Sequence, residues 1–371
     1  MKTVCKQNMC SGCMACVAAC AKNAITIKDS LEAYNAVIDL QKCVNCGACE
    51  RVCQSNCLIE ILKKPIEWHQ GWAIEHGIRE KASSGGAATA IMRTFVKRGG
   101  AVCSCTYTNG RFCFVAAETL EEIGQFTGSK YIKSNPSGIY EKAKNYLKNG
   151  RKVLFIGLPC QVSAIKNYVG IKLGTQLYTI DLICHGTPSP QVMDIFLKQY
   201  GMRLKDQTSF KFRDKDMFQV ATSGKYIVQK GAADRYSIAF LNSLTYTNNC
   251  YSCKYACLER VSDLTLGDAW GSELELKERK KGLSLMLVQT EKGRELIGEA
   301  ELHLEPIDLE KAVAANHQLE HPSVKCVNSE DFWVALREGK RFNTLVFRRF
   351  PKHCIRQNVK RVLLKLKVIH R

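Results

Sequence analysis

Two runs of cysteines near the start of the chain share one spacing, Cys-x2-Cys-x2-Cys-x3-Cys. The stretch CSGCMACVAAC holds the first run, which consists of Cys10, Cys13, Cys16 and Cys20. The stretch CVNCGACERVC holds the second run, which consists of Cys43, Cys46, Cys49 and Cys53. Two-residue gaps let a tight loop turn its sulfur atoms onto one centre, and this spacing is typical of 4Fe–4S ligation. A zinc site would not need the interleaved repeat.

In two-cluster modules with this spacing, the fourth cysteine of each run ligates the other cluster. The expected ligands of cluster one are Cys10, Cys13, Cys16 and Cys53. The expected ligands of cluster two are Cys43, Cys46, Cys49 and Cys20. Cys57 stands where the first half of the repeat has Ala24, so we expect a small core residue there. Residues 1–62 therefore predict a two-cluster 4Fe–4S ferredoxin module, which moves single electrons and performs no bond chemistry.

Three more cysteines lie close together in NNCYSCKYACLERVSDLTLGDAWG, namely Cys250, Cys253 and Cys257. A four-thiolate site needs ligands from elsewhere, and two short buried strands, KVLFIG and LYTIDLIC, each lead to a cysteine. If these strands are neighbours, their backbones lie about 4.8 Å apart, and ligands bind beyond the carboxyl ends of such strands. The candidate ligands of a third cluster are therefore Cys160, Cys184, Cys250 and Cys253. Cys257 is a rival for one place, and four unrelated buried cysteines are the alternative.

The elements that must position these cysteines alternate between strands and helices. Helical patterns in EKAKNYLKNG, VSAIKNYV and QVMDIFLKQY flank the two buried strands, which predicts a parallel arrangement. The stretch AVCSCTYTNGRFCFVAA predicts a hairpin that turns at Asn109–Gly110. Its Cys103, Cys105 and Cys113 are expected to be buried strand residues, with a metal set as the alternative. The predicted class is α/β, a small ferredoxin-like module followed by a larger mixed α/β domain with a partly parallel sheet.

Serines and glycines precede a helical pattern in SSGGAATAIMRTFVKRGG. Glycine lets backbone N–H groups approach an anion, and the start of a helix favours negative charge. The segment therefore predicts contact with a phosphate or a flavin, and an ordinary helix cap with close packing is the alternative. Residues 63–82, just before it, predict a linker between the ferredoxin module and the larger domain.

The cysteine content indicates a reducing compartment. The chain has 20 cysteines in 371 residues, whereas disulfide scaffolds are normally short and secreted. The first residues, MKTVCKQNMCSGC, have no apolar signal-peptide core, and no run approaches the roughly 18 apolar residues of a membrane span. We therefore expect a cytoplasmic protein.

The formal net charge is +19, and part of the surplus lies at the C-terminal end. Residues 337–371 contain twelve Lys or Arg and one acidic residue, Glu338. Residues 336–371 thus predict a basic amphipathic tail that contacts a membrane surface or an acidic partner. The alternative is a terminal helix that packs on the body through its apolar side. No recognition fold for nucleic acid is visible, so no nucleic-acid partner is expected.

Five motifs follow one another in the order SSGGAATAI, TGSKYIKSNPSGIY, VLFIGLPCQVSAIK, DLICHGTPSP and CYSCKYACLERVSDLTLGDAWG. Together they resemble the family of coenzyme F420 hydrogenase/dehydrogenase beta subunits. The resemblance implies a catalytic domain over residues 83–335, a bound FAD, and coenzyme F420 as a candidate substrate. It also implies that a 4Fe–4S cluster is bound by Cys160, Cys184, Cys250 and Cys253. The implied flavin contacts are Ser84, Gly85, Gly86, Gly128, Ser129 and Lys130.

The resemblance also suggests roles for other residues of these motifs. Lys130 would offset flavin phosphate charge as a point cation, and an exposed surface lysine is the alternative. Asp268 and Trp270 in GDAWG would line the flavin cavity, unless they form a buried turn and a core aromatic. His185 follows a ligand cysteine and is a candidate proton relay, although a hydrogen-bonded neighbour of the cluster is the commoner case. No other catalytic residue is assigned.

The expected function is an oxidoreductase that passes electrons between reduced coenzyme F420 or a ferredoxin-type donor, a bound flavin and 4Fe–4S clusters. A flavin exchanges two electrons with a hydride donor and one with a cluster, so it belongs between them. The acceptor is a redox partner protein or a small molecule. The alternative is a flavin-free electron-transfer adaptor that docks onto a partner reductase.

Overall fold

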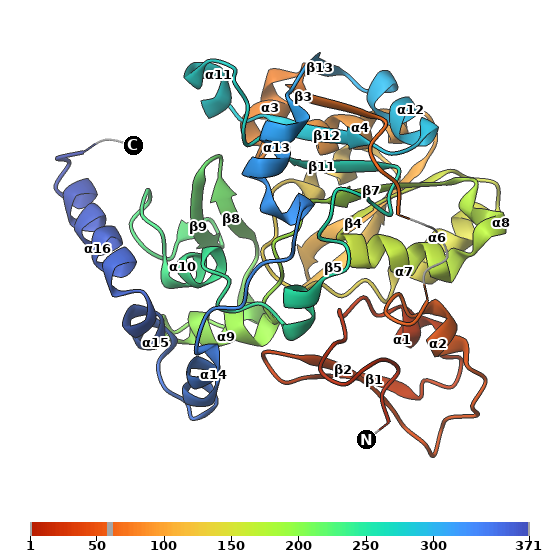
Figure 1. Ribbon diagram of the computed structural model, residues 1–371, viewed down its shortest axis with the longest axis horizontal. Helices are drawn as coiled ribbons and strands as arrows, with labels where there is room; N and C mark the ends of the chain where they lie inside the picture. Colours follow the sequence, from red (N-terminus) through yellow and green to blue (C-terminus); the bar gives the residue numbers. More distant parts are fainter. Residues whose placement is uncertain (1, 58–61, 370–371) are drawn as a thin grey trace.

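The N-terminal module lies against one side of a larger domain (Figure 1). The computed structural model describes residues 2–57 and 62–369. Each cysteine run ends in a short helix whose preceding residue, Met14 or Gly47, takes a left-handed backbone conformation that tightens the loop. The two strands of the module pair antiparallel from Ile25↔Ile38 to Asp29↔Tyr34. The elements are α1 (Ala15–Ala19), β1 (Ile25–Asp29), β2 (Tyr34–Ile38) and α2 (Ala48–Val52).

The larger domain is built on a mixed sheet of eight strands in the described part of the chain. Its order is β13-β3-β12-β11-β7-β6-β4-β5, and the pairs β4–β6, β6–β7 and β7–β11 are parallel. The strands are β3 (Glu67–Ala73), β4 (Ala101–Thr108), β5 (Arg111–Ala117), β6 (Val153–Gly157), β7 (Leu177–Leu182), β11 (Leu264–Asp268), β12 (Ser284–Val288) and β13 (Leu302–Glu305). The predicted α/β class with a partly parallel sheet is confirmed.

Helices cover both faces of this sheet, so the central strands are buried on both sides. All five residues of β6 are buried, as expected for a parallel strand. On one face, β6 packs through Phe155 against α6 and α7 and, beyond them, the ferredoxin module. On the other face, Leu154 packs against α4. These helices are α3 (His76–Lys81), α4 (Ala87–Lys97), α5 (Leu120–Ile123), α6 (Ile139–Lys148), α7 (Pro159–Val169), α8 (Ile171–Gly174), α11 (Leu276–Lys280), α12 (Glu291–Glu299) and α13 (Leu309–Ala315).

Local sequence explains why the elements begin and end where they do. The β4–β5 hairpin turns at Asn109 and Gly110, which both have positive φ, as a two-residue hairpin turn requires. Helix α7 starts with Pro159, and the Gln161 side chain accepts a hydrogen bond from the Leu158 N–H at 2.9 Å. The start of α7 fixes the point at which the chain leaves β6, and Cys160 follows directly.

A second hydrophobic core lies beside the main sheet, around a small antiparallel sheet. Its helices bury aromatic side chains such as Phe196, Trp333 and Phe342. The elements are α9 (Pro190–Lys198), β8 (Phe210–Asp214), β9 (Met217–Thr222), β10 (Lys225–Tyr226), α10 (Arg235–Leu241), α14 (Ser329–Arg337), α15 (Phe342–Arg349) and α16 (Pro351–Lys365). Among the described helices, none has the length and apolar character needed to cross a membrane.

Two expectations from the sequence are wrong. Residues 63–82 are not a linker, because β3 pairs with both β12 and β13 inside the main sheet and α3 follows it. The polar residues Glu67, His69 and Gln70 hide this strand in the sequence, although Gln70 is buried and its amide bonds the Pro306 carbonyl. Cys57 is exposed rather than part of the core, because it lies at the surface end of the ferredoxin module.

Candidate iron–sulfur and flavin sites

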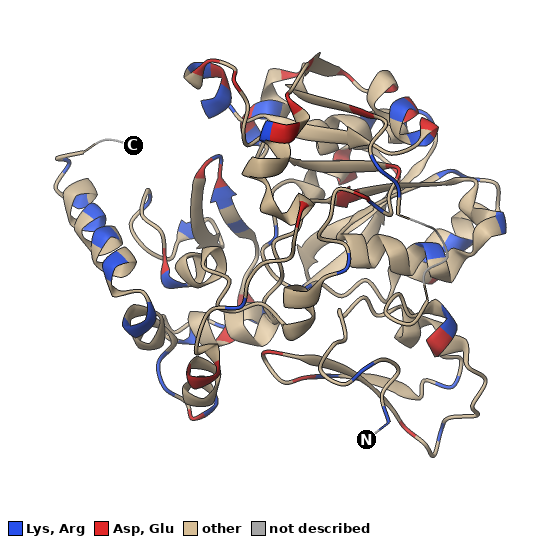
Figure 2. Ribbon diagram, in the orientation of Figure 1, with Lys and Arg blue, Asp and Glu red and all other residues tan. Residues whose placement is uncertain are grey.

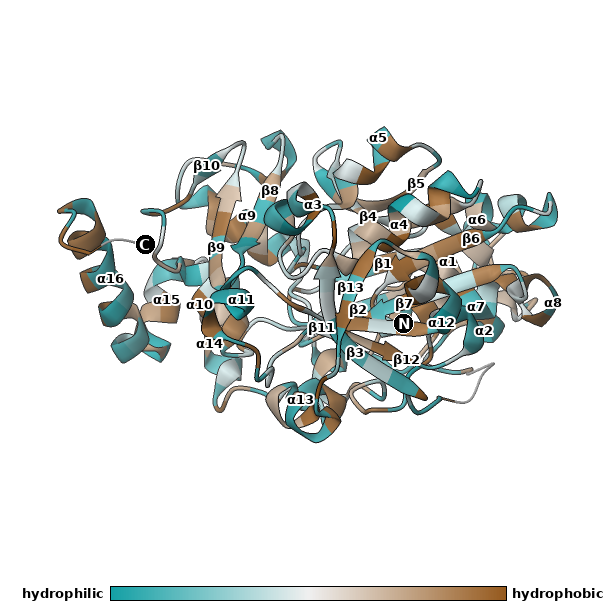
Figure 3. Ribbon diagram, turned by 90° about the horizontal axis from the view of Figure 1, so that it is seen from above, coloured by the Kyte–Doolittle hydropathy of each residue, from teal (hydrophilic) through white to brown (hydrophobic). Residues whose placement is uncertain are grey.

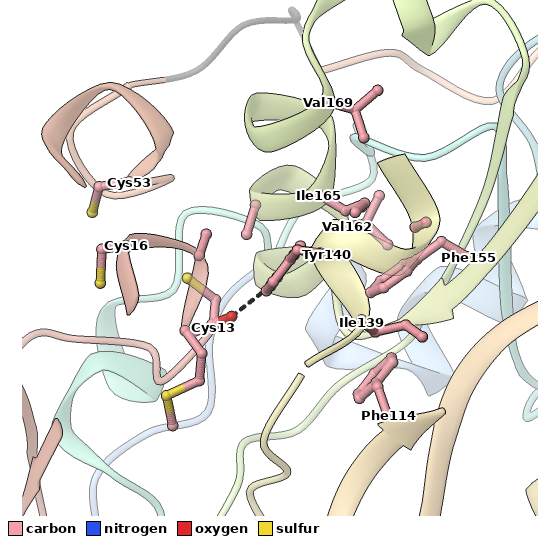
Figure 4. Close-up of a cluster of buried hydrophobic side chains, with 14 of the residues drawn as sticks. Cys13, Cys16, Cys53, Phe114, Ile139, Tyr140, Phe155, Val162, Ile165 and Val169 are labelled. Carbon is pink, nitrogen blue, oxygen red and sulfur yellow. Dashed lines mark hydrogen bonds between the residues drawn. The ribbon is translucent and has the colours of Figure 1, made fainter. Parts of the chain in front are cut away.

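The first three cysteines of the first run lie together with the last cysteine of the second run. Figure 4 shows Cys13 and Cys16 with Cys53 beside them. Burial raises the pKa of Cys13 to about 12, and the nearby Cys10 and Cys53 contribute in the same direction. The backbone N–H of Gly12, a residue with a φ of +73°, donates to the Cys10 sulfur at 3.4 Å. All four cysteines are 5–7% exposed, so cluster one would be deeply enclosed.

A fifth cysteine, Cys5, lies against this group. A hydrogen bond from Cys5 lowers the pKa of Cys53 to about 6, and another lowers the pKa of Cys10 to about 7. Cys5 thus touches one ligand from each run and is itself buried. Its thiol can donate a proton toward ligand sulfur without being a ligand, and hydrogen bonds to cluster sulfurs tune reduction potential.

The remaining cysteines of the two runs lie at the outer side of the module. Cys46 is exposed, and its neighbour Val44 is 61% exposed. The Asn45 N–H donates to the Cys43 sulfur at 3.5 Å, and the Ala24 N–H donates to the Cys20 sulfur at 3.3 Å. Burial and Glu50 raise the pKa of Cys49, and Cys20 acts in the same direction. Cluster two would therefore face solvent.

The two strand-end cysteines of the body lie on neighbouring parallel strands. β6 pairs with β7 from Val153↔Leu177 to Gly157↔Asp181. Cys160 sits in the first turn of α7, just beyond β6, and Cys184 follows the end of β7. Burial raises the pKa of Cys184 to about 12, with Cys250 and Cys253 as further causes. The sheet therefore brings together cysteines that are far apart in the sequence.

These cysteines surround one cavity. It has a volume of about 270 Å³, and its lining includes Cys160, Cys184, Cys250 and Cys253. Cys250 and Cys253 come from the short 3₁₀ segment Asn248–Ser252 and the residue after it. Cys257 does not line the cavity, because its thiol donates instead to the carbonyl oxygen of Glu259 at 3.1 Å. Four cysteines thus line one cavity, and the rival residue Cys257 does not.

Two buried cations adjoin this cavity. The Lys133 ammonium, on a residue only 4% exposed, donates to the Ser11 carbonyl at 2.9 Å and to the Thr187 hydroxyl at 3.1 Å. The Arg260 guanidinium is 1% exposed and pairs with the fully buried Asp181 at 3.0 Å. An oxidised cubane with four thiolates carries a net charge of about −2, so a cation beside the cavity offsets charge that water cannot reach.

The ferredoxin module and the body share contacts between cluster one and this cavity. The Tyr140 hydroxyl donates to the Cys13 carbonyl at 2.5 Å, the contact drawn in Figure 4. The Tyr255 hydroxyl donates to the Gln54 side chain at 2.7 Å, and Gln54 donates to the Ser11 hydroxyl at 3.1 Å. Burial raises the pKa of Tyr255, and both Cys160 and Cys13 contribute to that shift. The body cavity therefore lies next to cluster one, whose flanking residues help to line it.

The two segments expected to hold a flavin touch each other. The Ser129 N–H donates to the Ser83 hydroxyl at 3.0 Å, which joins the segment 83–86 to the segment 128–130. Gly86 precedes α4 without any side-chain cap, so the first turn of α4 has free N–H groups to offer. Gly128 has a φ of +87° and open space around it. This arrangement fits a phosphate or an adjacent flavin edge.

The other residues of these two segments make packing contacts and hydrogen bonds within the protein. A Cβ atom on Gly85 would lie 2.4 Å from the Gly71 carbonyl oxygen, so this glycine is required by close helix–sheet packing. The Lys130 ammonium donates to the Phe126 carbonyl at 2.6 Å, and burial lowers its pKa to about 8. The Lys215 ammonium donates to the Ser84 carbonyl at 3.1 Å and to the Ala82 carbonyl at 2.9 Å.

The weaker candidates make contacts with other side chains of the body. Asp268 makes a two-pronged ion pair with Arg213, at 2.5 and 2.8 Å, and Arg213 also lies over the Trp270 ring at 5.5 Å. His185 lines the cysteine cavity, and its Nδ1 is 2.7 Å from the Gln318 side-chain nitrogen. Burial lowers the pKa of His185 to about 4, and His317 acts in the same direction, so the imidazole is neutral near pH 7.

The cysteine groups fit cubanes better than single ions. Within residues 2–57 and 62–369, no three His, Cys, Asp or Glu side chains converge closely enough to bind one metal ion. In a 4Fe–4S cluster each thiolate binds a different iron atom, so the sulfur atoms stand around a larger body. The cavity of about 270 Å³, its cysteine lining and its buried cations match that requirement.

Several contributing residues escaped the sequence analysis. Lys133 lies in the motif TGSKYIKSNPSGIY. Tyr255 and Arg260 lie in the cysteine-rich motif CYSCKYACLERVSDLTLGDAWG. Their place inside these motifs is the one feature of the sequence that could have indicated a role at the site. Cys5 gave no signal, because it falls outside both repeats. Gln54 stands directly after the last cysteine of the second run, but nothing in the sequence shows that Tyr255 contacts it.

Models of known protein families match three segments of the chain. Residues 68–138 and 150–311 match the models for the N-terminal and C-terminal parts of the coenzyme F420 hydrogenase/dehydrogenase beta subunit, and residues 9–57 match a 4Fe–4S dicluster domain. A component of the F(420)H(2) dehydrogenase of Methanosarcina mazei is 22% identical over 294 residues, which cover 72% of this chain and 79% of that protein. A chain of the F420-reducing [NiFe] hydrogenase complex from Methanosarcina barkeri superposes with a TM-score of 0.48 at 19% identity, covering 70% of this chain and 90% of that one.

Proposed function

Because this chain belongs to the family of coenzyme F420 hydrogenase/dehydrogenase beta subunits, we propose that it is an iron–sulfur flavoprotein oxidoreductase with three 4Fe–4S clusters. It is an electron-transfer iron–sulfur protein of the F420 hydrogenase/dehydrogenase type. In the finer proposal, reduced coenzyme F420 or a ferredoxin-type donor exchanges electrons with a bound FAD. The electrons then pass through the clusters to a redox partner. The observation that carries this proposal is the cavity lined by Cys160, Cys184, Cys250 and Cys253 next to cluster one.

The proposed order of centres follows from which residues adjoin each one. Ser11 and Gln54, which flank cluster-one ligands, line the body cavity, whereas Cys46 of cluster two is exposed. The order is therefore flavin, body cluster, cluster one, cluster two and then the partner. When bound, the flavin supplies the conversion between two-electron hydride transfer and single-electron transfer. The chain's own task is to hold these centres in sequence and to keep water out of the spaces between them.

The residues between the body cavity and cluster one perform that task. Tyr255 and Tyr140 are 3% and 0% exposed, and their hydroxyl groups are used in hydrogen bonds to the ferredoxin module. Lys133 bonds residues on both sides of the boundary, Ser11 in the module and Thr187 in the body. We assign Lys133 and Arg260 the role of holding positive charge beside the clusters, which makes electron uptake by a negatively charged centre easier.

The proposed flavin site is the junction of residues 83–86 with residues 128–130. Three observations support it: the hydrogen bond between Ser129 and Ser83, the uncapped start of α4 and the open space around Gly128. Lys215 holds the carbonyl oxygen of Ser84 and so fixes the loop conformation. The uncapped helix start favours an anion such as the flavin pyrophosphate.

Iron and flavin content test the proposal. Anaerobically reconstituted protein should contain about twelve iron atoms and about one flavin per chain, and reduced coenzyme F420 should bleach the flavin. Clusters without any flavin would contradict the oxidoreductase and favour the flavin-free adaptor. Flavin that is bleached by reduced ferredoxin but not by reduced F420 would keep the enzyme class and replace the donor.

A further inference from the structure

Helix α16 forms the outermost part of the molecule and carries an uncovered apolar stripe. In Figure 1 it lies at the left edge, and Figure 3, from above, also shows it beyond the rest of the chain. Ile355, Val359, Val362 and Leu366 follow one another at spacings of four, three and four residues, so they share one helix face. These side chains are 52%, 53%, 56% and 67% exposed. The stripe is therefore not the side through which the helix packs.

A different face of α16 attaches it to the body. Cys354 is fully buried in the second core, and the Gln357 side chain accepts a hydrogen bond from the Ala233 N–H at 3.0 Å. Asn358 accepts one from Arg235 at 3.0 Å. Leu364 lies against Gly231, where an added Cβ atom would meet its methyl group at 3.1 Å. These contacts use a face of the helix that includes Cys354 and Leu364, so α16 packs on the body through side chains other than the exposed stripe.

Positive charge surrounds the stripe. Helix α16 contains Lys352, Arg356, Lys360, Arg361 and Lys365 and no Asp or Glu. Figure 2 shows this helix with blue segments and none in red. On a helical projection, Lys352 and Arg356 fall next to one side of the stripe and Lys365 falls next to the other. A row of aliphatic side chains bordered by cations is the pattern of a helix that lies in the interface of an anionic bilayer.

We propose that α16 is an interfacial helix that docks the protein onto an anionic phospholipid surface. The four aliphatic side chains would enter the headgroup boundary, while the bordering lysines and arginines would contact lipid phosphates. The helix is about 22 Å long, and Figure 3 shows it at the outer edge of the molecule. A lipid surface is favoured over an acidic protein because the stripe offers aliphatic area with no aromatic anchor and no acceptor or donor group.

The test uses the full chain and two kinds of vesicle. One contains phosphatidylcholine alone, and the other contains phosphatidylcholine with about one third phosphatidylglycerol. Sedimentation should show binding to the anionic vesicles only, and added salt should weaken it. Two variants separate the contributions: Ile355→Ser with Val359→Ser, Val362→Ser and Leu366→Ser, and Lys352→Gln with Arg356→Gln and Lys365→Gln. Each should weaken binding by at least about tenfold, with iron content unchanged.

A matched control removes exposed aliphatic side chains elsewhere. Ile171, Val324 and Val327 are 78%, 76% and 75% exposed, and their replacement by serine should leave vesicle binding unchanged. A Val359→Trp variant reports insertion directly, because its fluorescence should shift to shorter wavelength on anionic vesicles. If the stripe variant binds as well as the parent while the charge variant does not, α16 is an electrostatic surface for an acidic protein and the proposal is overturned. Equal binding to neutral vesicles would also overturn it.

Discussion

At the scale of single residues, one short segment holds the residues that distinguish the ligands of the proposed body cluster. Cys253 lines the cavity, whereas Cys257 is turned toward the Glu259 carbonyl. We expect Cys253→Ser to lose the body cluster, which lowers iron from about twelve to about eight atoms per chain. Cys257→Ser should keep about twelve, because its thiol has no place at a cubane that already holds four thiolates. Iron analysis and EPR of the reduced protein measure both results. The reverse pattern would show that the ligand assignment is wrong.

Lys133 is expected to set the potentials of two clusters at once. Its charge acts on Cys10 of cluster one and on Cys160 and Cys184 of the body. Lys133→Met should therefore make the reduction potentials of cluster one and the body cluster more negative, and leave that of cluster two unchanged. An EPR-monitored redox titration resolves the three centres. Lys130→Met is the control, because Lys130 is a partly buried lysine that bonds the Phe126 carbonyl instead. Identical shifts in both variants would argue against a local charge effect.

The cysteine spacings alone predicted which ferredoxin residues lie together, but not the residues around them. Repeated gaps of two and three residues encode a local geometry that needs no knowledge of the rest of the fold. The Lys133 ammonium donates a hydrogen bond to the carbonyl of Ser11, which is 122 residues away in the chain, and no local sequence pattern predicts such a contact. Cys5 likewise gains its position only when Cys10 and Cys53 meet.

At the scale of elements, strand pairing explains what was and was not predictable. The buried strands β6 and β7, of which only Leu182 is partly exposed, were visible in the sequence because parallel strands appear as apolar runs. That the two strands are neighbours was only an assumption from the sequence. The structure pairs them, beginning at Val153↔Leu177, and this pairing brings Cys160 and Cys184 together. Strand β3 was missed, since Glu67, His69 and Gln70 interrupt its apolar pattern. In the fold, Arg294 bonds Glu67, the His69 ring lies against Glu67, and the Gln70 amide nitrogen bonds the Pro306 carbonyl.

The buried ion pair between β7 and the segment before β11 should be costly to break. Arg260→Met leaves the Asp181 carboxylate buried without its partner, so we expect the free energy of unfolding to fall by about 3–5 kcal/mol. The double variant Asp181→Leu with Arg260→Met should recover most of that loss, since no isolated charge remains. Urea unfolding under anaerobic conditions measures both. A double variant as unstable as Arg260→Met would mean that the hydrogen bonds of Arg260 to Tyr255 and Cys257 matter more than the charge pair.

At the scale of the whole molecule, the C-terminal region has two parts, one buried in the second core and one largely exposed. Phe342, Val346 and Cys354 are fully buried in the second core, whereas the residues of α16 beyond Gln357 are largely exposed. A chain ending at Gln357 should therefore keep about twelve iron atoms and its flavin. A chain ending at Lys340 should not fold, because loss of several fully buried side chains at about 2–5 kcal/mol each exceeds typical domain stability. Soluble yield and iron content measure the difference, and a well-folded protein ending at Lys340 would contradict this division.

The exposure of Cys46 has a consequence for damage by air. Thiolate oxidation follows exposure, so oxygen should destroy cluster two before it reaches the enclosed cluster one or the body cavity. Timed exposure should lower iron from about twelve to about eight atoms per chain in a first phase, with the EPR signals of the two inner clusters retained. In the proposed order of centres, protein at that stage would still accept electrons from its donor but would have lost its path to the partner. Brief exposure to air would thus leave a protein that takes up electrons but cannot pass them on. Loss of all iron in a single phase would show that burial does not set the order in which the clusters are lost.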